Sequence, residues 1–429
     1  MRLQSLATTL AALLLVGAIA GCHGSSTPTC SLSNPASLAT SSWPKSRHDL
    51  QNTGVIGNVS LSSNPTGSTL FSASFAGAQF IASPVLGNDD KRLYIGTSPD
   101  GVFYAFNLAN KTNDFTFTAL EGITQAALAA TRFGADAVFF GAGDGILQAL
   151  DSTGTAQPNF WPFGLGNGLT TAPAFNGIDG TVYAAGGPLI FAVCPNGIER
   201  FGYSFPHSVR STPGFGADGT AYFGADDRLI RAVDFKGALL WTFSTSAPVS
   251  TAVMVGLSAS TPPQTTAIYA VDSNGYFYKL SSTGQLLVSA QLMNNLLPVQ
   301  VTTVSPALVV TDSSERLYVL GDDGTLLSVD VAADAVTFAT LFSAGSPVRS
   351  SPAVAHSGTR DVIVFGADNG NVYFVYSDAT APVAVAVGAP IQSSPAIGCR
   401  RDSNNLCATD NTDGTVYIGA DDGKMQMIK

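Results

Sequence analysis

The feature of the sequence that most constrains its fold is a repeat that occurs eight times. Each unit opens on a Ser-Pro, Thr-Pro or Ala-Pro pair or a substitute for it, and contains two apolar stretches separated by a tight turn. The opening positions are Pro84, Ala127, Pro173, Pro213, Ala252, Pro306, Pro352 and Pro395, spaced by 39 to 54 residues. This period is typical of a four-stranded propeller blade. We predict an all-β, eight-bladed β-propeller of antiparallel blades over residues 43–429.

The turn inside the repeat has a chemistry of its own. Six units carry Asp-Gly or Asn-Gly there, which tolerate positive φ and suit a tight hairpin. The six glycines are Gly101, Gly145, Gly275, Gly324, Gly370 and Gly423. The fourth unit has Arg228 at this place and the third has Gly187, so we treat these two units as degenerate copies.

A fourth strand is predicted at the end of most units. The predicted ranges are 115–120, 198–205, 238–244, 286–291, 336–342 and 382–388. The eighth unit lacks such a stretch, but residues 69–75, before the first repeat, resemble one. We predict that this N-terminal strand completes the last blade, because pairing the two ends closes the ring and covers both sheet edges.

The N-terminus resembles an export signal. Residues 6–20 are apolar or small, follow Arg2 and precede Ile19-Ala20-Gly21-Cys22, which resembles a bacterial lipobox. We predict a signal peptide over residues 1–21, lipidation of Cys22 and a flexible tether over 22–42. The alternative is an ordinary secretory signal. His23 follows where an acidic residue would favour the inner membrane, so we expect an outer-membrane lipoprotein facing the periplasm or the exterior.

Four further cysteines follow the lipobox. Cys399 and Cys407 bracket a polar loop between two predicted strands, which predicts a local disulfide in an oxidising compartment. A bridge between Cys30 and Cys194 requires the tether to fold back, which the sequence leaves open. The sequence contains no Cys-x-x-Cys pair, the spacing that would indicate a zinc site.

The segment before the first repeat carries a family resemblance. Trp43-Pro44-Lys45-Ser46-Arg47-His48-Asp49, followed by Asn52-Thr53-Gly54, resembles bacterial proteins with pyrroloquinoline-quinone-like propeller repeats. The runs 149–154 and 232–237, the second followed by Trp241, are similar to the Ala-x-Asp…Gly…Trp docking motif of that family.

This resemblance implies the propeller fold and two functional branches. One branch comprises dehydrogenases that hold the quinone and Ca²⁺. Many of these enzymes contain an adjacent Cys-Cys pair, which this chain lacks. The other includes the propeller lipoprotein of the outer-membrane β-barrel assembly machinery, which is similar in length, lipobox and blade number and holds no cofactor.

Composition narrows the function. The formal net charge is −10, which disfavours a nucleic-acid partner because phosphate binding needs a basic surface. Only four histidines are present, and no Gly-x-Ser-x-Gly elbow, His-x-x-x-His pair or EF-hand spacing occurs. The acidic pairs in the hairpin turns are explained by turn chemistry rather than by Ca²⁺. We expect no bound cofactor.

Two groups of residues are candidate binding sites. The residue three before each opening position lies near one mouth of the channel, and around the ring these residues are Ile81, Thr124, Thr170, Arg210, Val249, Thr303, Arg349 and Gln392. Arg210 and Arg349 would bind an anion there; alternatively they pair with nearby aspartates. The second candidate is the apolar loop with Leu292, Met293, Leu296 and Leu297, which would either dock a partner protein or plug the space between two blades.

These observations favour a non-catalytic, lipid-anchored scaffold that binds envelope proteins, with outer-membrane protein assembly as the leading process. The first alternative is a quinone- or Ca²⁺-dependent oxidoreductase. A second is a protein that binds surface glycans, although three tryptophans offer few stacking surfaces.

Overall fold

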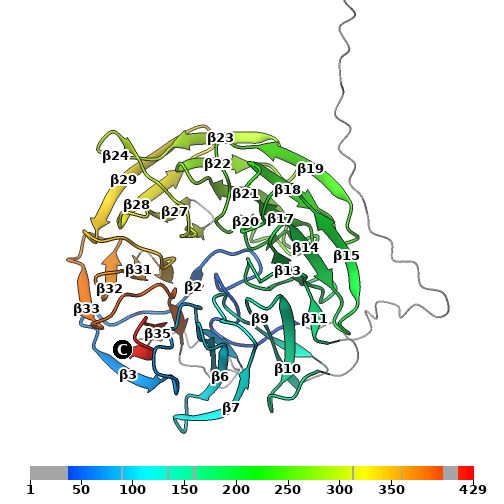
Figure 1. Ribbon diagram of the computed structural model, residues 1–429. Coiled ribbons are helices and arrows are strands. Elements are labelled where there is room, and N and C mark those ends of the chain that lie inside the picture. The colour runs from blue at the N-terminus through cyan, green and yellow to red at the C-terminus, as the bar shows by residue number, and fades with distance from the viewer. Residues whose placement is uncertain are drawn as a thin grey trace, which may run out of the picture.

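Eight sheets surround a central axis in the computed structural model (Figure 1). It describes residues 37–87, 90–132, 135–157, 161–311, 314–358, 360–399 and 414–429. Each sheet contains an antiparallel four-stranded blade, which we number 1 to 8 in chain order. The predicted all-β, eight-bladed propeller is therefore confirmed.

Each blade begins with a short strand next to the axis and continues outward. The innermost strands are β4 (Val85–Gly87), β8 (Leu128–Arg132), β12 (Ala174–Phe175), β16 (Gly214–Phe215), β20 (Met254–Leu257), β26 (Ala307–Val310), β30 (Ala353–Ser357) and β34 (Ala396–Gly398). The second strands are β5 (Arg92–Gly96), β9 (Ala135–Gly141), β13 (Val182–Gly186), β17 (Ala221–Gly224), β21 (Thr265–Val271), β27 (Glu315–Leu320), β31 (Arg360–Gly366) and β35 (Thr415–Gly419).

The outer two layers complete the blades. The third strands are β6 (Val102–Asn107), β10 (Ile146–Asp151), β14 (Leu189–Val193), β18 (Leu229–Val233), β22 (Tyr276–Leu280), β28 (Thr325–Val331), β32 (Asn371–Tyr376) and β36 (Lys424–Ile428). The outermost strands are β7 (Thr112–Thr118), β11 (Phe163–Gly164), β15 (Glu199–Ser204), β19 (Leu239–Ser244), β23 (Leu286–Gln291), β29 (Val336–Ser343), β33 (Val383–Ala386) and β3 (Gly67–Ser72).

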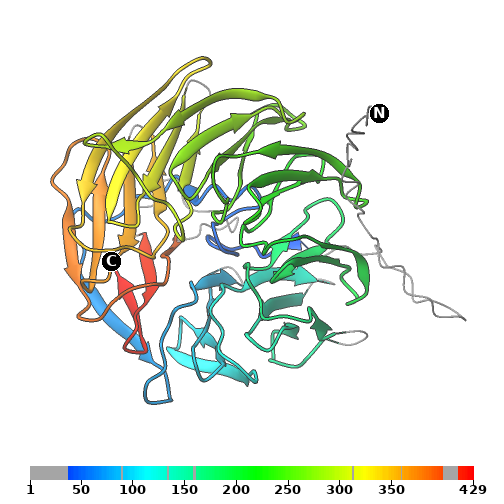
Figure 2. The ribbon, with the colours of Figure 1, turned by 45° about the horizontal axis from the view of Figure 1, so that its top comes forward.

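The last blade is completed by the N-terminal strand β3, as predicted. β3 pairs antiparallel with β36, and Gly67 lies opposite Ile428. Figure 2 shows this blue strand beside the red C-terminal strands. The strand covers residues 67–72 rather than the predicted 69–75. Because β3 and the C-terminal strands β34–β36 form one sheet, this pairing closes the ring and covers the edges that both would otherwise expose.

The second hairpin of each blade has the predicted turn chemistry. All six Asp-Gly or Asn-Gly glycines have positive φ, between 68° and 83°. The two degenerate units keep this conformation, with φ of 64° at Arg228 and 58° at Gly187. The backbone shape of the turn is therefore common to all eight blades, even where the favoured residue has been replaced.

Aromatic side chains of the outer strands dock on the next blade. Trp241 of blade 4 donates an indole hydrogen bond to the Ser282 carbonyl of blade 5 at 2.9 Å. A Cβ on Gly284 would lie 2.7 Å from the Trp241 ring. Phe201 stands in the same relation to Gly237 of blade 4. A phenylalanine therefore replaces the tryptophan of the docking motif without loss of the inter-blade contact.

The core consists of apolar clusters, each shared by adjacent blades. One cluster joins Tyr94 and Phe103 of blade 1 to Phe140 of blade 2, and another joins Val271 of blade 5 to Leu308 of blade 6. The Tyr side chains of the second strands are among the largest buried groups. Burial between blades, and not within one blade, thus holds the ring together.

Candidate functional site

One mouth of the central channel is closed by the segment before the first repeat. This segment, residues 43–57, which we call the hub, includes β2 (Val55–Gly57) and crosses the centre of Figure 1. β2 pairs in parallel with β30 of blade 7, while the preceding β1 (Ser37–Leu38) pairs antiparallel with β8 of blade 2.

Backbone hydrogen bonds join the hub to six blades at one common register. In each of these blades the second residue of the innermost strand donates its N–H to a hub carbonyl, at 2.7–2.9 Å. The donor–acceptor pairs are Leu86–Trp43, Ala129–Pro44, Phe215–Leu50, Val255–Gln51, Leu308–Thr53 and Val354–Gly54. Blade 3 is reached instead by the Leu50 side chain. The hub is therefore a common floor for the ring.

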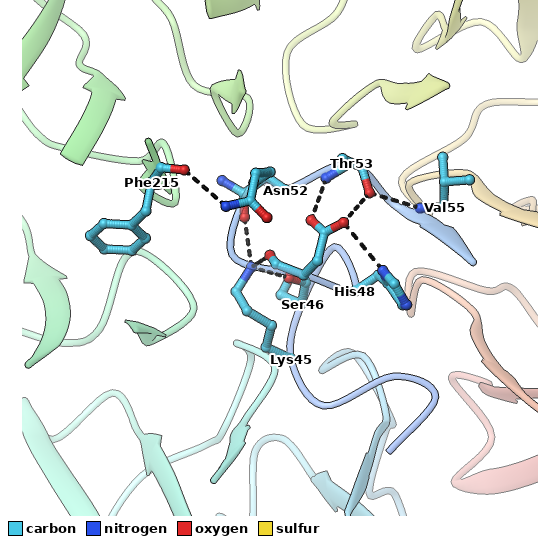
Figure 3. Close-up of polar contacts among 9 residues, drawn as sticks. Lys45, Ser46, His48, Asn52, Thr53, Val55 and Phe215 are labelled. Carbon is cyan, nitrogen blue, oxygen red and sulfur yellow. Dashed lines mark hydrogen bonds and ion pairs between the residues drawn. The ribbon is translucent and has the colours of Figure 1, made fainter. Parts of the chain in front are cut away.

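Buried polar side chains fix the shape of the hub. Lys45 is 0 % exposed, and its ammonium donates to the carbonyls of Ser46 and Asp49 and to Asn52 Oδ1, at 2.6, 2.8 and 2.6 Å (Figure 3). Asn52 Nδ2 in turn donates to the carbonyls of Thr212 in blade 4 and Val253 in blade 5, both at 3.0 Å.

Arg47 extends the hub to the other side of the ring. Its guanidinium donates to the carbonyls of Pro352, at 2.7 Å, and Pro306, which belong to blades 7 and 6. Arg47, His48 and Asn52 have φ of 63°, 71° and 57°, an uncommon conformation for such side chains. These contacts over-determine the backbone of the segment and hold it in this shape.

The hub charges are perturbed by burial. Burial lowers the pKa of Lys45 to about 7 and that of Arg47 to about 10, although the Asp49 carboxylate acts in the opposite direction on both. Burial would raise the pKa of Asp49, but hydrogen bonds from His48 and Thr53 outweigh it and leave this pKa below its usual value.

Sequence reasoning missed these hub residues as part of a site, because only the family resemblance singled out this segment. A usable signal was present: three charged residues lie within Lys45–Asp49 in a chain of which only 12 % is charged.

Above the hub lies a blind channel of about 340 Å³. Ser46 and Arg47 line it from the hub, and the residues that precede the innermost strands line its wall. Most lining side chains are Ser, Thr or Gln, and the charged ones are Arg47, Arg210 and Arg349.

Part of the channel wall is joined by a belt of four serines. Each hydroxyl of Ser305, Ser351, Ser394 and Ser83 accepts a hydrogen bond of 2.9 Å from a backbone N–H of the preceding blade. This serine belt runs from blade 5 through blades 6, 7 and 8 to blade 1. Blades 2 and 3 carry Ala126 and Ala172 at the same position, and alanine has no hydroxyl to continue the belt.

The register of blade 5 differs from the prediction by one residue. β20 begins at Met254, so Val253, and not Ala252, corresponds to the prolines that open other blades. The channel residue of this blade is consequently Ser250. Val249 is fully buried instead, where a Cβ on Gly224 would lie 2.4 Å from it. The other seven predicted ring residues line the channel.

Arg210 and Arg349 both form ion pairs at the channel mouth. Arg210 Nε lies 3.0 Å from Asp226 Oδ2, and Arg349 donates from its Nε and one amine to Asp368 Oδ1 at 3.1 and 2.9 Å. The alternative of pairing with nearby aspartates is therefore observed. The aspartates do not line the channel, whereas both arginines do.

The predicted partner loop is a small hairpin on the rim between blades 5 and 6 (Figure 1). β24 (Met293–Asn294) pairs with β25 (Leu297–Pro298). Leu296 and Leu297 are 89 % and 70 % exposed, whereas Leu292 is fully buried in the core between these blades. The base of the loop packs between the two blades and its tip faces solvent, so docking of a partner at the tip stays a prediction. Leu292 is therefore unavailable to a partner.

Cys22, Cys30 and Cys407 lie outside the described residues. Lipidation of Cys22 and the pairing of Cys399 with Cys407 and of Cys30 with Cys194 remain predictions. No helix in the described part of the chain is long and apolar enough to span a membrane.

The channel does not fit a quinone supported by Ca²⁺. Its described lining contains no aromatic ring to stack on a quinone and no carboxylate to ligate the cation. The described ranges also contain no cluster of three His, Cys, Asp or Glu residues suited to a metal. Few tryptophan rings are exposed that could stack on a sugar, because Trp43 and Trp161 are only 3 % and 7 % exposed.

A family profile described as "Outer membrane protein assembly factor BamB" matches residues 143–376, more than half of the chain. The chain belongs to this family. A comparison of this BamB-family chain with curated proteins finds no match.

Solved structures with the same fold have diverse functions. BamB from Moraxella catarrhalis is 15 % identical with a TM-score of 0.59, covering 85 % of this chain and 98 % of that one. Quinohemoprotein alcohol dehydrogenase from Comamonas testosteroni is 14 % identical with a TM-score of 0.59, covering 90 % and 80 %. A europium-containing methanol dehydrogenase is 12 % identical with a TM-score of 0.62, covering 91 % and 98 %. At these identities the likeness establishes the fold alone.

Proposed function

We propose that this BamB-family chain is a non-catalytic, lipid-anchored scaffold that binds other proteins of the bacterial envelope, with outer-membrane protein assembly as the process served. The family match carries the proposal. The lipobox-like sequence ending in Cys22 supports export and anchoring, and the channel lining argues against the quinone-dependent alternative.

The tip of the β24–β25 hairpin is the proposed contact for the partner protein. Leu296 and Leu297 project two large apolar side chains into solvent, and Leu296 has a φ of 69°. Asn294 ties the hairpin to blade 6 through Thr325 Oγ1 at 3.1 Å. A fixed, exposed apolar tip is suited to burial in a protein interface.

Crosslinking in intact cells tests the proposal. The full chain should give discrete protein adducts, and L296S/L297S should reduce at least one of them. L120S is the matched control, because Leu120 is 85 % exposed but lies between blades 1 and 2. Complete absence of adducts would count against the scaffold role, and unchanged adducts in L296S/L297S would count against the hairpin. Substrate-dependent dye reduction after adding quinone and Ca²⁺ would instead favour an oxidoreductase.

A further inference from the structure

The blind channel concentrates positive charge in an acidic protein. The chain has a formal net charge of −10, yet the charged side chains that line the channel within the described residues are Arg47, Arg210 and Arg349. Asp226 and Asp368 hold the last two from outside the lining. The channel interior therefore presents guanidinium groups and hydroxyls, and no carboxylate among the described lining residues.

Arg47 at the floor is incompletely satisfied. It is 5 % exposed, and its Nε is buried with no hydrogen-bond partner among the described residues. A buried cation with an unpaired donor is costly unless an anion or acceptor meets it. Burial lowers the pKa of Arg47, and the nearby Asp49 carboxylate offsets this effect only in part.

The unbelted side of the wall supplies further donors. In the serine belt each backbone N–H is satisfied by the hydroxyl of the next blade. After Ser83 and Ala126 the next blades carry alanine at this position, so these two N–H groups find no such hydroxyl. Both residues line the channel, Ser83 at the end of the belt and Ala126 in blade 2, opposite blade 6.

At the mouth the ion pairs leave donors available. Arg210 uses only Nε for Asp226, and Arg349 uses Nε and one amine for Asp368. Their remaining N–H groups have the planar arrangement that recognises phosphate and carboxylate. Both side chains are accessible to a solute, being 57 % and 42 % exposed.

We propose that this channel binds a small, hydroxyl-rich anion, a phosphorylated or carboxylated sugar, with its acidic group between Arg47 at the floor and Arg210 and Arg349 at the mouth. The Ser and Thr wall pairs with the sugar hydroxyls, and a volume of about 340 Å³ admits one such molecule. This ligand site is independent of the proposed protein-binding hairpin.

Titration calorimetry of the full chain tests the site, with glucose 6-phosphate, glucuronate and neutral glucose as probes at constant ionic strength. At least one anionic probe should bind saturably and glucose much more weakly. R210Q/R349Q should weaken that binding about a hundredfold, because each lost charge-assisted hydrogen bond to the acidic group is worth about tenfold. The tighter anionic probe identifies the acidic group.

The matched control is R316Q. Arg316 is 38 % exposed and ion-paired with Asp330 at 2.6 Å, but it lies in β27 and does not line the channel. R316Q should leave binding unchanged. No saturable binding of either anionic probe, equal binding of glucose, or an unaffected R210Q/R349Q variant would each overturn the proposal. None of these results depends on the crosslinked partners, so the two proposals fail separately.

Discussion

Blades 5 to 8 and blade 1 are joined near the axis by the serine belt, whereas the four interfaces from blade 1 to blade 5 lack the belt and each carry an aromatic pair. Phe103 of blade 1 stacks on Phe140 of blade 2 with centroids 3.9 Å apart. Aromatic pairs also cross the next three interfaces: Phe163–Phe191, Tyr183–Phe215 and Phe243–Tyr278. On the belted side, aromatic pairs cross from blade 6 to 7 (Phe342–Phe365) and from blade 8 to 1 (Phe71–Phe106), whereas none among the described residues crosses from 5 to 6 or from 7 to 8.

The difference shows that one repeat register supports two ways of joining blades. On one side of the ring a hydroxyl satisfies a backbone N–H at the axis, with aromatic pairs at two of the four interfaces. On the other side aromatic pairs further out occur at every interface and no belt is present. On the side without the belt, backbone N–H groups of the channel wall have no serine hydroxyl as acceptor. The two sides of the channel therefore differ in the hydrogen-bond donors that they offer a ligand.

Breaking the aromatic side should have the largest effect. Phe140 is fully buried, and F140A should lower the free energy of unfolding by about 3–5 kcal/mol through lost burial and a residual cavity. Chemical denaturation measures this loss. F75A is the control, because Phe75 is 56 % exposed and should cost less than about 0.5 kcal/mol. Equal effects of the two changes would show that the stacked pair adds nothing specific.

The titration of Lys45 in the hub gives a pH-dependent test of the unbelted side of the ring. The backbone of Lys45 forms a β-bridge with Leu128 of blade 2. The pKa of Lys45 is lowered to about 7 in the folded state, below its value in the unfolded chain. The unfolded chain therefore binds more protons above pH 7, and stability should rise with pH there. Relative to K45M, the wild type should gain about 2 kcal/mol between pH 7 and pH 9.

Denaturation of the wild type and K45M across this pH range measures the difference in their free energies of unfolding. The titration of all other groups is common to both proteins and cancels in this difference. A flat or falling difference would mean that the three oxygen acceptors keep the ammonium charged throughout.

Breaking the serine belt should have a smaller effect. S351A removes the acceptor for the Ser305 N–H and leaves this donor unpaired at a partly buried residue; Ser351 itself is 7 % exposed. We expect a loss of about 1–3 kcal/mol in the free energy of unfolding. The reciprocal change A126S places a hydroxyl beside the Ser83 N–H and should add about 0.5–1.5 kcal/mol. The comparison between the two sides fails if S351A is neutral.

The sequence predicted the blade count, the closing strand β3 and the positive-φ turns because each follows from a local pattern that recurs along the chain. It misplaced blade 5 because Val253 stands where other blades have proline, and a one-residue shift exchanged Val249 for Ser250. The two-residue strand β11 was too short to leave a pattern. Arg210 and Arg349 were correctly located at the channel, since their position follows from the repeat.

The floor of the site could not be predicted in the same way. The hub has no repeat, and its hydrogen bonds join residues more than 300 positions apart, such as Arg47 and Pro352. A single sequence holds no signal that pairs these residues. The serine belt was equally hidden, because a serine before proline is an ordinary start to a strand until its neighbour around the ring is known.

The hub also changes how the molecule should fold. Repeat proteins in which each unit touches only its neighbours unfold piecemeal, and nucleation anywhere can propagate. Here a single N-terminal segment bonds to blades spread over the whole chain, so these contacts form only after most of the chain has been synthesised. Such long-range contacts slow folding and couple distant blades. The ring should therefore lose its structure as one cooperative unit, and removing the hub should convert that single transition into several.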